Sequence, residues 1–194
     1  MTGVQTCALP ISNTFSGPLI LGCGTVSVPS FDALGTGSIT LGPGTLRLTA
    51  SAATERGLTL QAGSSRAVTL RADADLTLGG PIQAASGAFI KTGPGTVSLT
   101  HPGVNILAAN EGNSDQLQNP SAHGDSPTTG FAGLTVNQGK LAVGVPGQTN
   151  ICNQRISIGA FTTTNANEET SGELEINDGR SEERRVGKEC RSRW

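Results

Sequence analysis

Apolar residues in this chain recur two positions apart, which is the spacing expected of β-strands that bury one face. A small or polar residue separates the two members of each pair, so the opposite face is polar. The pairs are Val26/Val28, Ile39/Leu41, Leu46/Leu48, Leu58/Leu60, Val68/Leu70, Leu76/Leu78, Val97/Leu99, Leu134/Val136, Leu141/Val143, Ile156/Ile158 and Leu174/Ile176. Gly, Pro, Asn and Asp lie between these segments at positions that favour turns, and no amphipathic helix is predicted. The chain is therefore expected to be all-β.

Two stretches of the chain are close copies of each other. Residues 39–49 read ITLGPGTLRLT and residues 90–100 read IKTGPGTVSLT, with seven of eleven positions identical and no gap. A second pair, residues 15–28 and 131–143, aligns with one deletion. Short strands at this spacing fit either a β-sandwich or a solenoid. The internal copies favour the solenoid, because each repeat of a solenoid buries its apolar face against its neighbours.

These Gly- and Thr-rich segments resemble the autotransporter-associated β-strand repeat. The resemblance depends on KTGPGTV (91–97) and NTFSG (13–17), and it covers most of residues 13–144, with a degenerate continuation at 172–176. It implies a right-handed parallel β-helix that belongs to the secreted passenger of a bacterial surface protein.

The expected β-helix spans residues 12–179. It departs from the repeat at Leu41-Gly42, where the repeat has Thr-Gly, and at a long loop over residues 101–130. With about 20 to 25 residues in each coil, we expect about seven coils. No capping segment is evident at either end, so we expect the isolated chain to associate or to stay partly unfolded.

The two ends of the chain have a different character. The head, residues 1–11, and the tail, residues 180–194, resemble translations of the two strands of a common short-read sequencing adapter. The tail carries six Lys/Arg and three Glu, a composition that would otherwise suggest a polyanion-binding arm. We expect both segments to be disordered and without a native fold. When they are set aside, Cys23 and Cys152 remain, and no disulfide framework is expected.

The loop at residues 101–130 holds the strongest candidates for a binding site. His101, His123, Asp115 and Asp125 lie in it, and imidazole and carboxylate groups are suitable ligands for zinc or copper. The alternative is a solvated loop rich in Asn, Ser, Gly and Pro. Two histidines without further ligands at the usual spacing do not predict a metal site, so no metal or cofactor is expected.

Two pairs of acidic residues are candidates for general acid–base chemistry on a glycan. Asp73 and Asp75 lie two apart, as do Glu173 and Glu175, so each pair is expected to share a strand face. An ordinary solvated face explains them better, because catalysis needs a cleft and a matched partner as well as acidic groups. Cys23 and Cys152 have no nearby histidine in the sequence and are not expected to be nucleophiles. No residue is therefore predicted to be catalytic.

A non-enzymatic structural or adhesive segment is the expected function. The chain would be secreted or displayed at the bacterial cell surface, held at the outer membrane by another region, with surface glycans or neighbouring cells as partners. The alternatives are a peripheral part of a β-helical polysaccharide-active enzyme and a ligand-binding module that uses the 101–130 loop. Only 3% of the residues are aromatic and no basic stripe is present, which argues against nucleic acid. No apolar run approaches the roughly 20 residues that a transmembrane helix needs.

Overall fold

The computed structural model describes residues 13–63, 67–108, 133–152, 155–159 and 171–177. Its strands form three sheets. The first sheet contains β1 (Leu19–Leu21), β3 (Ile39–Leu41), β6 (Leu58–Gln61), β9 (Ile82–Ser86), β12 (Val104–Ala108) and β15 (Thr149–Cys152). The second contains β2 (Gly24–Val28), β4 (Gly44–Leu48), β7 (Ala67–Ala72), β10 (Ala88–Thr92), β13 (Gly133–Val136) and β16 (Arg155–Ile158). The third contains β5 (Ala52–Thr54), β8 (Leu76–Leu78), β11 (Thr96–Leu99), β14 (Gly139–Val143) and β17 (Gly172–Ile176).

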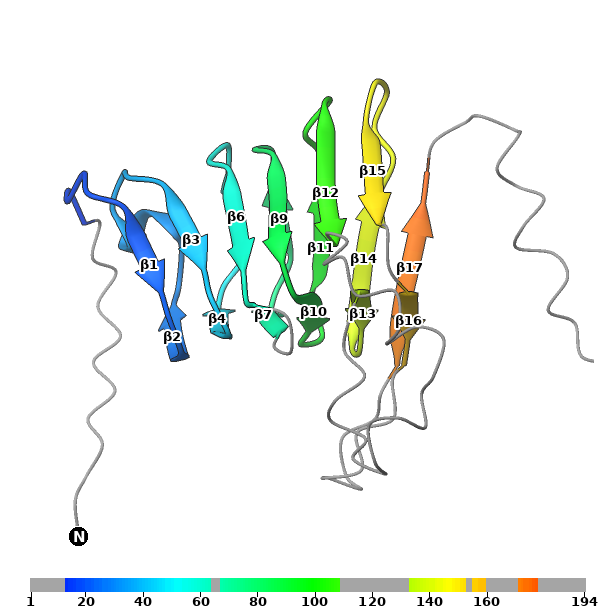
Figure 1. The fold of residues 1–194 in the computed structure, drawn as a ribbon, viewed down its shortest axis with the longest axis horizontal. Coiled ribbons are helices and arrows are strands. Elements are labelled where there is room, and N and C mark those ends of the chain that lie inside the picture. The colour runs from blue at the N-terminus through cyan, green and yellow to red at the C-terminus, as the bar shows by residue number, and fades with distance from the viewer. Residues whose placement is uncertain (1–12, 64–66, 109–132, 153–154, 160–170, 178–194) are drawn as a thin grey trace, which may run out of the picture.

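The chain visits the three sheets in rotation, and every strand pairs in parallel with the equivalent strand of the next turn. Leu19 lies beside Ile39, and Ile39 lies beside Leu58, so one turn takes about 20 residues. Figure 1 shows the turns following one another along the long axis, from β1 at one end to β17 at the other. This arrangement confirms the prediction of a parallel β-helix.

Six turns are present in the described part of the chain, where about seven were expected. The difference arises because the later turns are longer than the early ones. Val104 of β12 pairs with Thr149 of β15, and the connection from β12 to β13 contains residues 109–132. Even so, β13 keeps its register with β10, Phe89 lying beside Leu134.

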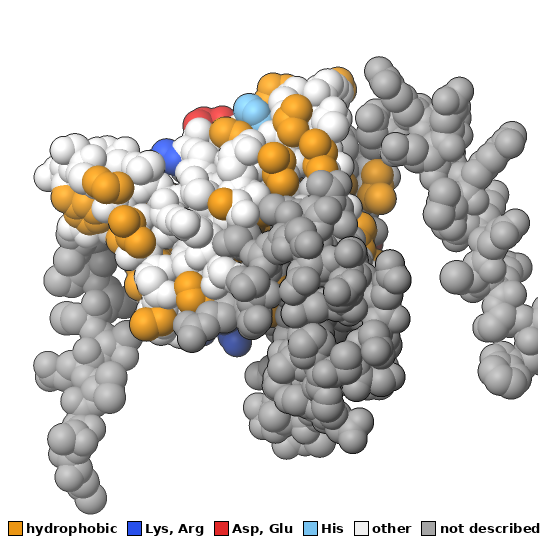
Figure 2. All heavy atoms as spheres, viewed as in Figure 1, with side chains coloured by type: hydrophobic (Ala, Val, Ile, Leu, Met, Phe, Trp, Pro, Cys, Tyr) orange, Lys and Arg blue, Asp and Glu red, His pale blue; other side chains and the backbone are white. Residues whose placement is uncertain are grey.

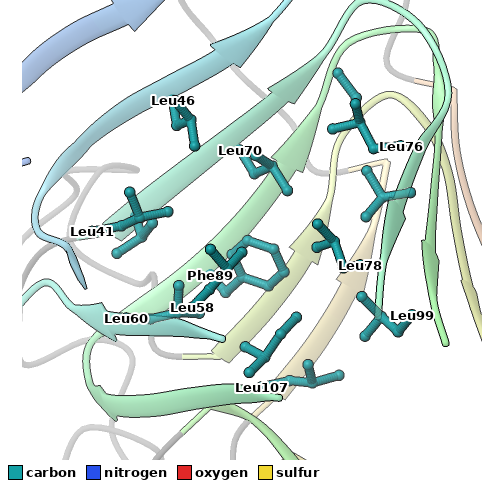
Figure 3. Close-up of a cluster of buried hydrophobic side chains, with 14 of the residues drawn as sticks. Leu41, Leu46, Leu58, Leu60, Leu70, Leu76, Leu78, Phe89, Leu99 and Leu107 are labelled. Atoms are coloured by element: carbon teal, nitrogen blue, oxygen red, sulfur yellow. The ribbon is translucent and has the colours of Figure 1, made fainter. Parts of the chain in front are cut away.

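The core consists of the inward side chains of all three sheets, which stack in rows along the axis. Figure 3 shows leucines from several turns and Phe89 pointing into the space that the sheets enclose. Burying one such side chain contributes roughly 1.5–3 kcal/mol relative to leaving it exposed. One row of the second sheet runs Val26, Leu46, Leu70, Lys91, Val136 and Ile158.

The three sheets form the sides of a three-sided prism, and the close copies in the sequence lie at different edges of it. Gly42-Pro43-Gly44 leads from β3 to β4, at the edge between the first and second sheets, whereas Gly93-Pro94-Gly95 leads from β10 to β11, between the second and third. The second pair of copies behaves in the same way, the first forming β1 and β2 and the second forming β13 and β14. The repeated unit is therefore a strand, a corner and a strand, and not a complete turn.

The first turn closes with an element that was not predicted, the 3-10 helix η1 (Phe31–Leu34). It takes the place of a strand next to β5, and the side chains of Phe31 and Leu34 are 2% and 3% exposed. The Arg56 guanidinium donates hydrogen bonds to the carbonyls of Phe31, Gly35 and Gly37, which fixes this segment to the second turn. At the N-terminal end η1 thus adds two buried apolar side chains to the first turn, and the expectation that the chain carries no capping segment stays a prediction.

The last described turn is open. Ile156, Ile158 and Ile176 continue inward rows, lying beside Leu134, Val136 and Val143, yet they are 47%, 51% and 65% exposed. No described residue lies beyond them along the axis. The expected association or partial unfolding of the isolated chain stays a prediction.

The predicted start of the loop at residues 101–130 was too early. Val104–Ala108 forms β12, with Asn105 and Leu107 buried and Val104 exposed. The strand was missed because Asn105, a polar residue, occupies an inward position and interrupts the apolar pattern. The adapter-like segments 1–11 and 180–194 lie outside the described residues.

Candidate functional site

A row of threonines follows the outward face of the second sheet. Thr25 of β2 lies beside Thr45 of β4, and Thr45 lies beside Thr69 of β7, so their side chains are in register along the axis. Neighbouring strands of a sheet are about 4.8 Å apart, which sets the spacing of the hydroxyl groups. We call Thr25, Thr45 and Thr69 the threonine row. Figure 2 shows that charged side chains are few on the face of the molecule drawn there, where white atoms predominate on the described surface.

Two arginines lie beside the threonine row. Arg47 and Arg71 are register neighbours in β4 and β7, each two positions after a threonine of the row, so they point to the same face. Asp73 lies between them: its two carboxylate oxygens accept hydrogen bonds from Arg47 Nε at 2.5 Å and from Arg71 Nε at 2.8 Å. The backbone amide of Asp73 donates to the carbonyl of Leu48, which fixes the corner that carries the carboxylate. We call Arg47 and Arg71 the arginine pair.

The electrostatics of this cluster favour its ionised form. Partial burial raises the pKa of Asp73, but hydrogen bonds from Arg71 and Arg47 and the charges of both guanidinium groups lower it below its usual value. At neutral pH the three side chains therefore carry one net positive charge. The arginine side chains are 42% and 38% exposed, and the aspartate side chain is 17% exposed. The positive groups thus face solvent more than the negative one does.

Lys91 forms a second, buried polar cluster. Its amine donates hydrogen bonds to the carbonyl oxygens of Gly93 at 2.6 Å, of Gln138 at 2.7 Å, and of Gly95. Gly93 and Gly95 belong to the same turn as Lys91, and Gln138 belongs to the next. Burial lowers the pKa of Lys91 to about 8, and the negative charge of Asp75 opposes the shift. This lysine joins two successive corners and is enclosed by protein, which suits it to a structural role.

A third polar cluster lies at the corner that leads back to the first sheet. Asn105 is 0% exposed; its side-chain oxygen accepts from the Ile82 amide at 3.0 Å, and its amide group donates to Asn150 Oδ1 at 3.2 Å. Asn150 lies beside it in the next turn and donates to Gln148. Gln148 in turn donates to the carbonyls of Leu99 and His101. These bonds join successive turns in the same way as those of Lys91.

The two predicted acidic pairs lie in different kinds of position, one pair in a corner and the other on a strand. Asp73 and Asp75 do not share a strand face, because both lie in the corner between β7 and β8, where Asp75 accepts a hydrogen bond from the Thr96 amide at 2.8 Å. Glu173 and Glu175 do share the outward face of β17. Lys140 pairs with both of them, at 3.1 Å and 2.8 Å.

The charges around Lys140 lower the pKa of one glutamate. The hydrogen bond from Lys140, a second one from Asn177 and the charge of Lys140 lower the pKa of Glu175. Hydrogen bonds to Glu175 and Glu173 raise the pKa of Lys140 itself. The cluster is accordingly held in its ionised form at neutral pH.

The remaining predicted candidates are only partly described. His101 lies just before β12 and is half-buried, while His123, Asp115 and Asp125 lie outside the described residues. Within the described ranges no three His, Cys, Asp or Glu side chains gather in a way that could hold a metal ion. Cys23 is exposed at the corner between β1 and β2, and Cys152 is half-buried in β15.

Sequence reasoning missed the arginine pair and Lys91. Arg47 stands between Leu46 and Leu48, and Arg71 between Leu70 and Ala72, so the alternation marks both arginines as outward residues. Their proximity depends on the stacking of two turns, which no local pattern shows. Lys91 entered the sequence analysis only as the first residue of KTGPGTV (91–97), although its position two residues after Phe89 marks it as inward-facing.

No helix in the described part of the chain is long and apolar enough to cross a membrane. Comparison with protein-family models, with curated proteins and with solved structures finds no match to this chain.

Proposed function

We propose that this chain is a non-enzymatic structural or adhesive segment of a secreted or surface-displayed bacterial protein of the autotransporter passenger type. The observation that carries the proposal is the threonine row, in which hydroxyl groups of successive turns lie in register on one face. Hydroxyl groups both donate and accept hydrogen bonds, as the hydroxyl groups of sugars do. A regular row along a stacked solenoid suits a carbohydrate chain that lies parallel to the axis.

The ionic state of the acidic residues supports display rather than glycan hydrolysis. A general acid at a glycosidic bond needs a raised pKa, so that its proton is present at neutral pH. Asp73 and Glu175 have lowered pKa values instead, because Arg71 and Arg47 bind the first and Lys140 binds the second. Their chemistry suits ion pairs that hold neighbouring turns together.

In this proposal the solenoid lies outside the cell, as the resemblance to autotransporter passengers implies, and surface glycans or neighbouring cells are its partners. Its turns are joined by side-chain hydrogen bonds of the buried residues Lys91 and Asn105, in addition to the sheet hydrogen bonds. Binding groups are presented best by a rigid scaffold, because less freedom is lost on binding.

The test is the binding of the full chain to surfaces coated with a panel of neutral and acidic polysaccharides. The variant Thr45→Val/Thr69→Val removes two hydroxyl groups of the threonine row and keeps the β-branched shape of the side chains. The matched control is Thr59→Val/Thr77→Val, which removes two outward hydroxyl groups that lie on different sheets and are not in register with each other. We expect the first variant to bind less polysaccharide than the parent and the control to bind as the parent does.

Two results would overturn the proposal. The first is the absence of binding to every polysaccharide in the panel. The second is the release of new reducing ends during incubation, lost on substitution of Asp73 or Glu175, which would favour the enzymatic alternative.

A further inference from the structure

The arginine pair is held in place by the fold. Arg47 and Arg71 come from adjacent turns, and their Nε atoms share the carboxylate of Asp73. A long side chain that is already fixed loses less conformational freedom when it binds a ligand. The two guanidinium groups are therefore preorganised side by side on the second sheet.

The contacts of the arginine pair leave binding groups available. Among the described residues, the side-chain hydrogen bonds of Arg47 and Arg71 involve only Nε. A guanidinium group has five N–H donors, and the two side chains are 42% and 38% exposed, so their terminal nitrogens keep donors for a ligand. Within the described part of the chain, one carboxylate for two guanidinium groups leaves one positive charge without an internal counter-charge.

The surroundings of the arginine pair are hydroxylic. Ser27 lies beside Arg47 in the preceding turn, and Thr92 lies beside Arg71 in the following turn. The threonine row runs parallel to this line, with Thr45 and Thr69 two residues before the arginines. The described outward positions of β2, β4, β7 and β10 carry no Asp or Glu. A ligand on this face would thus meet positive charge flanked by hydroxyl groups.

We propose that the arginine pair and the threonine row together bind a linear polysaccharide that carries carboxylates, a polyuronate, along the axis of the solenoid. This inference rests on the proposed function and names the class of glycan. Guanidinium groups match carboxylates in a planar, two-bond geometry, and Asp73 already shows both arginines bound to that group. The adjacent hydroxyl row supplies hydrogen bonds to the sugar ring, and the spacing of about 4.8 Å between turns is comparable with the length of one sugar unit.

The test is calorimetric titration of the full chain with alginate, a polyuronate without sulfate, in low-salt buffer. We expect Arg47→Gln and Arg71→Gln each to weaken alginate binding by about tenfold, because each removes a charge-assisted hydrogen-bond donor. Lys140→Gln removes the same single charge from the third sheet, where Lys140 is bound to two glutamates, and is expected to leave alginate binding unchanged. Dextran and dextran sulfate serve as the neutral and sulfated comparison polymers.

Asp73→Asn guards against a loss of binding that only reflects misfolding. The new amide oxygen can still accept a hydrogen bond from one of the arginines, while loss of the carboxylate raises the net charge of the cluster from one to two positive charges, so we expect Asp73→Asn to strengthen alginate binding. A damaged fold would not bind more tightly.

The outcomes separate this inference from the proposed function. Glycan binding that depends on Thr45 and Thr69 but not on the arginine pair would overturn the inference and leave the proposed function standing. Equal losses for Lys140→Gln and the arginine variants would also overturn the inference, as would weaker or unchanged binding by Asp73→Asn or tighter binding of dextran sulfate than of alginate. A chain that binds none of the three polymers would overturn the inference, and the proposed function would fall with it when every other polysaccharide of the panel also goes unbound.

Discussion

Because the amine of Lys91 is buried, we expect the free energy of unfolding to rise with pH in the alkaline range. This direction is unusual for a lysine. The side chain is 0% exposed, and burial lowers its pKa from 10.5 to about 8, with the charge of Asp75 opposing the shift. Between these values the unfolded chain holds a proton that the folded chain has released, so the free energy of unfolding rises with pH. Each pKa unit corresponds to about 1.4 kcal/mol, which gives roughly 3 kcal/mol over the whole window.

The assay is equilibrium unfolding in urea, followed by far-ultraviolet circular dichroism, at several pH values between about 8 and 10.5. The chain contains no tyrosine, so no phenol ionises in this range. The variant Lys91→Met keeps a straight, flexible side chain in the core and removes the titrating group. We expect the free energy of unfolding to rise with pH for the parent and to stay nearly level for Lys91→Met.

A second variant tests the cause of the shift. Asp75→Asn removes the negative charge that stabilises the Lys91 ammonium, so the rise in stability should begin at a lower pH than in the parent. Parallel pH dependences for the parent and Lys91→Met would refute the reasoning, because the amine would then titrate alike in the folded and unfolded chains.

Three further substitutions test the packing of the turns by the same unfolding assay. Gly139→Ala is expected to destabilise the chain by about 1–3 kcal/mol, because Gly139 has a φ of 66° and an added Cβ would meet a buried amine and two carbonyl oxygens. Gly22→Ala, with nothing within 4 Å of its added Cβ, is the control, and equal losses at the two glycines would contradict this explanation. Leu70→Ala, at a side chain that is 0% exposed, is expected to lose about 2–5 kcal/mol, and a loss below about 1 kcal/mol would be inconsistent with a packed core. Asn105→Ala should lose about 1–3 kcal/mol by leaving a buried backbone amide without its acceptor, and no loss would argue that this bond is not formed.

The strands could be predicted because their buried residues are apolar and recur two positions apart, a pattern visible within a few neighbouring residues. A pair such as Leu76 and Leu78 lies two positions apart on one strand, and both side chains are 1% exposed. The corners were predictable for the same reason, since Gly-Pro-Gly stands at each of two of them. Local patterns identify strands and turns because the physical causes, alternation and turn geometry, act within a few residues.

The partnerships between turns could not be predicted in the same way. Arg47 and Asp73 are 26 residues apart in the sequence, and they meet only because one turn stacks on the next. Polar inward residues such as Lys91 and Asn105 break the apolar pattern, and each is accommodated by backbone groups of a neighbouring turn. A single sequence shows such a residue as an interruption, whereas the stacked structure shows what satisfies it.

A duplicated strand–corner–strand segment need not return to the side of the prism from which it came. The copies at residues 39–49 and 90–100 lie one edge apart around the axis. Because each copy supplies two strands to a coil of three strands per turn, inserting one more copy would rotate everything downstream by two thirds of a circle. Side chains that faced one direction before such an event would face another after it, with the interior unchanged. Proteins built in this way can therefore turn an existing binding surface in a new direction by changing the number of strand–corner–strand units.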